Sequence, residues 1–207
     1  MATTYTAYFD ASGHPSDGLA MFVAGFVSSA EKWSKFGTQW KALLKKYGID
    51  PPFHMTDFMS KTGKYENWQT FPDEKRRLFL FEAIRTIKRN TRKSFAIGIL
   101  QKELEKAKRE YMFDLLEEPA YVWCGMSAIK KAMQWMERHG VHHNDIELIF
   151  EKGDLKQHNL EEAAFKTWKI LPIFRPNADL VPFQAADFLG VMLECCGWRE
   201  TNRRILG

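Results

Sequence analysis

The opening of the chain constrains its fold most, because two strand-like segments follow each other across a short turn. Residues 4–12 (TYTAYFDAS) and 19–29 (LAMFVAGFVSS) are rich in aromatic and β-branched residues. The stretch between them, SGHPSDG, has the composition of a turn. We therefore expect the chain to begin with a β-hairpin.

Helical and strand-like patterns alternate along the rest of the chain. Ser29 and Gly48 bound a first helix with apolar residues at spacings of three and four. Further helices are predicted over 72–90, 102–111, 118–140 and 160–170 and around Asp187, strands over 94–100, 145–151 and 171–174, and an irregular connector over 50–71. This order predicts an α/β layer structure, a mixed sheet with helices on its faces. No repeat, low-complexity tract or linker interrupts it, so we expect one domain over residues 1–207.

Hydropathy and charge bound the function class. The longest uncharged run, residues 18–30, has 13 residues and is too short to span a bilayer, and the N-terminus lacks the pattern of a signal peptide. We expect a cytoplasmic protein without a membrane partner. The net charge is +4, but residues 31–109 hold 19 Lys and Arg against 9 Asp and Glu. This +10 surplus is typical of a polyanion binder, although a single run such as KRNTRK (88–93) also fits the solvated face of a helix.

One carboxylate stands out because it lies inside an apolar run. Asp187 is in VPFQAADFLGVML (181–193), and no basic residue lies one helical turn away. A buried charge without compensation costs several kcal/mol, so Asp187 either faces water or has a partner. Gln184, one turn earlier, shares its face and could orient Asp187 or contact substrate.

Other acidic residues follow predicted strands, where ligands tend to bind in α/β sheets. Asp10 closes the first strand, Glu151 closes 145–151, and Asp154 comes after Gly153. From the residues alone, Asp10 before Ser-Gly is equally consistent with a turn, and EKGD with a solvated loop. His54 and Asp57 are one turn apart if the connector is locally helical, where they would form either a general base pair or a structural cap.

Four short segments together carry a family resemblance. They are YFDASG (8–13), FHMTDF (53–58), IFEKGD (149–154) and QAADFLG (184–190), spread in order over nearly the whole chain. In these segments the chain resembles the domain-of-unknown-function family numbered 3800, whose members resemble the ribonuclease-H-like superfamily. One departure is Ala11, which replaces the glutamate of the family's usual Asp-Glu-Ser-Gly.

The resemblance implies both a fold and a chemistry. The fold would be a ribonuclease-H-like α/β domain, a mixed five-stranded sheet with its first three strands antiparallel, helices on both faces and extra helical insertions. The chemistry would be hydrolysis of nucleic-acid phosphodiesters by acidic residues that meet at the sheet centre and bind Mg²⁺ or Mn²⁺. Two carboxylates about 4 Å apart repel by about 4 kcal/mol at an effective dielectric constant of about 20, so a cation among them is expected.

In a two-metal arrangement each residue has an expected role. Asp10 would bridge the ions, Glu151 and Asp187 would complete their coordination, and Asp154 is a possible further ligand. His54 would act as general acid or base. The residues expected to contact substrate are Ser12, Asp57, Gln184, Arg89, Arg92 and Lys93.

A non-catalytic alternative stays open at this point. The chain could be a nucleic-acid-binding or partner-binding module that keeps the fold with an impaired acidic centre, and Ala11 is the best argument for it. Motifs of other chemistries are absent, including Gly-x-Ser-x-Gly, Gly-x-x-x-x-Gly-Lys and His-Glu-x-x-His. Dependence on a metal would separate the enzyme from the binding module.

Overall fold

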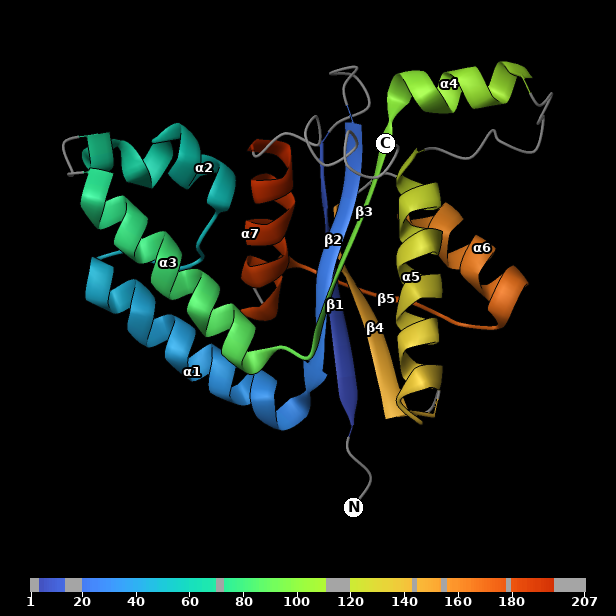
Figure 1. Ribbon diagram of the computed structural model, residues 1–207, viewed down its shortest axis with the longest axis horizontal. Helices are drawn as coiled ribbons and strands as arrows, with labels where there is room; N and C mark the ends of the chain where they lie inside the picture. The colour runs from blue at the N-terminus through green and yellow to red at the C-terminus, as the bar shows by residue number, and fades with distance from the viewer. Residues whose placement is uncertain are drawn as a thin grey trace, which may run out of the picture.

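Five strands form one mixed sheet in the computed structural model, which describes residues 4–13, 20–69, 73–110, 120–142, 145–153, 156–177 and 180–195 (Figure 1). The strands are β1 (Tyr5–Ser12), β2 (Ala20–Ser29), β3 (Lys93–Leu100), β4 (Ile146–Glu151) and β5 (Ile173–Arg175). Their order is β3-β2-β1-β4-β5, with β2 antiparallel to β1 and β3, and β4 parallel to β1 and β5. The predicted opening hairpin is therefore confirmed.

Helices cover both faces of this sheet (Figure 1). On one side lie α1 (Ala30–Tyr47), α2 (Met55–Ser60), α3 (Asp73–Asn90) and α7 (Pro182–Cys195), with α7 directly against β1 and β2. On the other side α5 (Ala120–Arg138) packs on β2 and β3, and α6 (Gln157–Trp168) packs on α5, while α4 (Gln101–Glu110) continues from the end of β3. This mixed five-stranded α/β arrangement with helices on both faces is the one that the resemblance implies, and the expected fold class is confirmed.

Local signals explain where the elements begin and end. The Ser29 side chain accepts a hydrogen bond from the Lys32 N–H at 3.4 Å, and Gly48 ends α1 with a left-handed φ of 68°. Two predictions of local structure were wrong. The connector over 50–71 is not irregular throughout, because it contains α2 and a 3₁₀ helix at Gly63–Gln69, and α6 begins at Gln157 rather than at 160.

Alternation along β1 separates two kinds of surface. Ala7 and Phe9 point into the apolar core beneath α5, where Phe9 stacks on Phe150 of β4. Tyr8 points the other way and makes edge contacts with Trp33 of α1 and Phe183 of α7. Because side chains alternate between faces of a strand, Asp10 lies on the face of Tyr8, toward α7.

None of the helices in the described ranges is long and apolar enough to cross a membrane.

Candidate functional site

Asp10 and Glu151 lie side by side at the carboxyl ends of two parallel strands. The register of β1 and β4 pairs Phe9 with Phe150, so the next residue of each strand reaches the same level of the sheet. Burial raises the pKa of Asp10 well above its usual range, and the hydrogen bond and charge of Glu151 and the charge of Asp187 raise it further, against the Ala11 N–H, which lowers it.

Asp187 of α7 is the third carboxyl group of this cluster. Burial raises the pKa of Asp187 to about 6, and the charges of Glu151 and Asp57 also raise it. Two neighbours lower it, the Met55 N–H, which donates to Oδ2 at 2.8 Å, and the charge of His54. Asp187 acts on Asp10 through its charge, whereas Glu151 is in direct contact with Asp10.

Close approach of α7 to β1 makes this meeting possible. A Cβ atom added at Gly190 would lie 3.1 Å from the Cβ of Ser12, so a glycine lets the helix sit against the strand. Asp187 is one helical turn before Gly190 and Asp10 is two residues before Ser12. Ser12 therefore lies on the face of the acidic cluster and packs against α7.

The connector places His54 and Asp57 beside Asp187. His54 occupies the N-cap position of α2, but its side chain makes no capping hydrogen bond, so the interpretation as a structural cap is not supported. Its backbone N–H donates to the Tyr65 hydroxyl at 3.3 Å. Asp57 lies in the first turn of α2, and its charge raises the pKa of both Asp187 and Tyr65. Burial is the main cause that raises the pKa of Tyr65 to about 12.

Sequence reasoning missed two residues beside Glu151. The Asn177 Nδ2 donates to Glu151 Oε2 at 3.2 Å from the segment after β5. Arg175 of β5 is the register partner of Glu151, is exposed, and lies on the same face because neighbours in register share a face. The available signal was the short strand 171–174, whose end must lie near the end of β4 if the two strands are parallel.

Gln184 corrects a predicted role. Its side chain is only 4% exposed, and its Oε1 accepts hydrogen bonds from Trp40 Nε1 at 2.8 Å and from the Phe53 N–H at 3.0 Å. A side chain buried and bonded in this way has no free surface for substrate. The prediction that Gln184 contacts substrate was therefore wrong, and so was the idea that it orients Asp187 directly.

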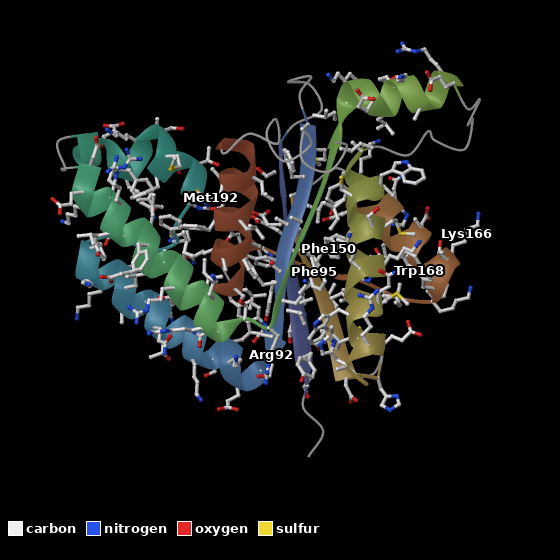
Figure 2. All side chains as sticks on the ribbon, viewed as in Figure 1. Arg92, Phe95, Phe150, Lys166, Trp168 and Met192 are labelled. Carbon is white, nitrogen blue, oxygen red and sulfur yellow. The ribbon has the colours of Figure 1, made fainter. Side chains whose placement is uncertain are left out.

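The structure does not bring Arg89, Arg92 and Lys93 to the acidic cluster, and their expected contact with substrate stays a prediction. Lys93 pairs with Val27, and Val27 pairs with Ala7, three residues before Asp10 on β1. Three strand residues span about 10 Å. Figure 2 shows Arg92 where α3 leads into β3, at the end of the sheet away from the carboxyl ends of β1 and β4. This basic group lies at the opposite end of the sheet from the site.

Ala11 lies on the face away from the cluster. It packs against the apolar core beneath α5 together with Phe9, whereas Asp10 and Ser12 face α7. A glutamate at this position would thus leave β1 on the α5 side. The departure from the family's pattern removes no carboxylate from the group formed by Asp10, Glu151 and Asp187.

The carboxyl groups of Asp10, Glu151 and Asp187 are chemically suited to bind a hard divalent ion. Glu151 and Asp187 both lie near enough to Asp10 for their charges to raise its pKa. Oxygen donors of this kind are the ligands of Mg²⁺ and Mn²⁺. Across the described ranges, however, no group of three or more His, Cys, Asp or Glu side chains is arranged to hold a metal ion. Asp154, the possible further ligand, lies outside the described residues.

Comparisons with known proteins add little to this geometry. No family model and no curated protein matches the chain. Among solved structures, the chain is similar to one in the PCNA:RNase HII complex from Archaeoglobus fulgidus, with 12% identity, a TM-score of 0.47, and 97% of this chain and 77% of that chain covered. The order and the directions of the five strands define the fold, independently of this likeness.

Proposed function

We propose that this protein is a divalent-metal-dependent phosphodiesterase that hydrolyses nucleic acid, with two metal ions at the carboxyl ends of β1 and β4. One observation carries the proposal. Asp10, Glu151 and Asp187 come from three distant segments and meet on one face of the sheet, where burial and mutual repulsion raise the pKa values of Asp10 and Asp187. Such a cluster destabilises the folded protein unless a cation or a proton neutralises it.

The Asp10 and Glu151 carboxyl groups would hold the first ion in place of the proton that the raised pKa of Asp10 favours. Asp10 and Glu151 are in contact, so they are the ligands nearest to a common position, and Asp187 would join them from α7. A bound Mg²⁺ or Mn²⁺ would supply Lewis acidity, polarising a phosphate oxygen and lowering the pKa of a water molecule. Asn177 would keep Glu151 oriented through its 3.2 Å hydrogen bond.

The remaining groups have roles that follow from their placement. The His54 imidazole lies near Asp187, makes no capping bond, and is therefore available to accept or donate a proton during hydrolysis. Arg175 is exposed on the face of Glu151 and can contact a phosphate there. The +10 surplus of residues 31–109 favours a polyanionic substrate longer than one nucleotide.

The binding-module alternative loses its main argument in this geometry. It depended on Ala11 as a sign of an impaired acidic centre, but Ala11 lies on the α5 face. The three carboxyl groups on the α7 face are all present. A module that only bound nucleic acid would have no use for carboxylates held together at a cost in stability.

The test is cleavage of mixed-sequence DNA, RNA and hybrid oligonucleotides with Mg²⁺, Mn²⁺ or Ca²⁺. We expect cleavage by the wild type with Mg²⁺ or Mn²⁺, little with Ca²⁺, and a large loss in Glu151→Gln. The matched control is Glu147→Gln, which changes an exposed acid on the same strand, four residues from the cluster, and should retain activity. No metal-stimulated cleavage of any substrate by the wild type would overturn the proposal.

A further inference from the structure

Two side chains of α7, one helical turn apart, hold the same short segment of the connector. Gln184 Oε1 accepts from the Phe53 N–H at 3.0 Å, and Asp187 Oδ2 accepts from the Met55 N–H at 2.8 Å. Residues three apart on a helix lie on the same face, so both bonds reach the segment from one direction. His54 lies between the two anchored amides, and α7 thereby fixes its backbone on both sides.

Gln184 is itself held firmly. Its Oε1 also accepts from the indole Nε1 of Trp40 at 2.8 Å, and the Trp40 side chain is fully buried. A carbonyl oxygen has two lone pairs, and here α1 uses one and the connector the other. The amide therefore cannot rotate without breaking both bonds, and the position of the Phe53 N–H is tied to the packing of α1 against α7.

A neutral amide suits this position better than a carboxylate. Gln184 is 4% exposed and lies one turn from Asp187, so a glutamate would bring a further buried charge toward the acidic cluster. An apolar side chain would leave the buried Trp40 and Phe53 donors without their acceptor. A glutamine at position 184 is therefore suited to hold a backbone segment rather than to contact a ligand.

We propose that Gln184 is a positioning residue, which holds the Phe53–Met55 segment so that His54 stays beside Asp187. The inference rests on the function proposed above, in which His54 transfers a proton. Gln184 is too buried to contact substrate, so its replacement should lower kcat and leave KM nearly unchanged. Its effect should be transmitted through His54.

The first test reads the segment directly and needs no activity. Amide hydrogen exchange is measured for wild type, Gln184→Met and the matched control Trp40→Phe, which removes the indole donor but keeps the bond to Phe53. We expect the Phe53 amide of Gln184→Met to exchange about five- to tenfold faster, the factor of one lost hydrogen bond, and the Met55 amide, which keeps its bond to Asp187, to change less. In Trp40→Phe, which keeps the Phe53 bond, the Phe53 amide should change less than in Gln184→Met. Unchanged exchange in Gln184→Met would overturn the proposal. If that variant does not fold, Gln184→Asn, with its amide arm one methylene shorter, must show the same pattern.

The second test is a double-mutant cycle between Gln184→Met and His54→Ala under cleavage conditions. We expect Gln184→Met to lower kcat about tenfold or more in the wild-type background and to have little further effect in His54→Ala. Equal losses in both backgrounds would show that Gln184 only stabilises the fold. If the wild type itself cleaves no substrate, the proposed function fails, whereas hydrogen exchange still decides whether Gln184 holds the segment.

Discussion

The two faces of β1 and β4 differ completely at the same level of the sheet. On the α5 face, Phe9 and Phe150 stack with ring centroids 4.8 Å apart inside an apolar core. On the α7 face, one residue further along each strand, Glu151 lies close enough to Asp10 to raise the pKa of its carboxyl group. A single step along a strand therefore separates a surface that stabilises the fold from one that destabilises it.

The two faces differ because one buries apolar rings and the other buries carboxyl groups. Burial of aromatic rings on the α5 face removes apolar area from water and stabilises the protein. Burial of carboxyl groups on the α7 face raises the pKa values of Asp10 and Asp187, which means that their charged forms are disfavoured there. We therefore expect substitution of the aromatic residues around Phe9 on the α5 face to change stability, and substitution of the carboxyl groups on the α7 face to change chemistry.

The largest effect is expected for Asp10→Asn. Removal of this ligand should lower metal-dependent cleavage by several orders of magnitude, because Asp10 lies at the centre of the cluster. In the presence of chelator the variant should melt at the same temperature as the wild type or higher, since it removes like-charge repulsion. Calorimetry and cleavage are measured on one preparation. A large fall in melting temperature would mean that Asp10 is a structural residue.

Phe95→Ala is the corresponding change on the α5 face. Phe95 is 5% exposed on β3, with its ring centroid 6.0 Å from that of Phe9. Truncation of a buried phenylalanine should cost about 3–5 kcal/mol of unfolding free energy. Urea denaturation measures this loss, and the Mn²⁺ affinity of the folded variant should stay at the wild-type value. A changed affinity at unchanged stability would contradict the division between the faces.

The pH dependence of Asp187→Asn sharpens the comparison. Between about pH 4, the ordinary pKa of an aspartate, and the folded-state pKa of about 6, folded Asp187 keeps a proton that the unfolded chain has released. The stability of the wild type should fall as the pH rises through this interval. The asparagine variant has no carboxyl group at this position, so its stability should not fall for this reason. The stability of Asp187→Asn relative to wild type should therefore rise from pH 4 to above pH 6 and then level off. Thermal melts in chelator across this range would contradict the account if the difference stayed constant.

Ala11→Glu is expected to have the smallest effect on chemistry. The new carboxylate would enter the apolar core beneath α5, so it should cost about 1–3 kcal/mol of stability and should not raise the cleavage rate. Rates are compared per folded molecule, with Ala11→Gln as a control of similar size. A clear gain of activity in the glutamate variant alone would place this residue on the α7 face.

Much of the fold was predictable because its signals are local. The opening hairpin, Ser29 and Gly48 around α1, and the apolar spacing of α5 each depend on a few neighbouring residues. Asp10 and Glu151 were found because strand ends collect functional side chains. Asp187 was found because a carboxylate in an apolar helix needs compensation, and its partner, the Met55 N–H, comes from a segment 132 residues away.

Placement across long distances in the sequence could not be predicted. The distance of Arg89, Arg92 and Lys93 from Asp10 depends on β3 running parallel to β1, which puts the first residues of β3 at the end of the sheet away from Asp10. Gln184 shares a helix face with Asp187, yet Trp40 and Phe53 from other elements bury it. The side of Ala11, in contrast, followed from the two-residue period of a strand and could have been predicted.

The measurement that tests the central claim most directly is Mn²⁺ binding followed by calorimetry in buffers of different ionisation enthalpy. The account predicts that Mn²⁺ binds to the wild type with release of a proton, because the raised pKa of Asp10 favours its protonated form and a metal ligand must give up its proton. Asp10→Asn should lose most of this binding, and Glu147→Gln should retain it. Absence of binding at millimolar Mn²⁺, or equal binding by Asp10→Asn and wild type, would contradict a metal centre on the α7 face.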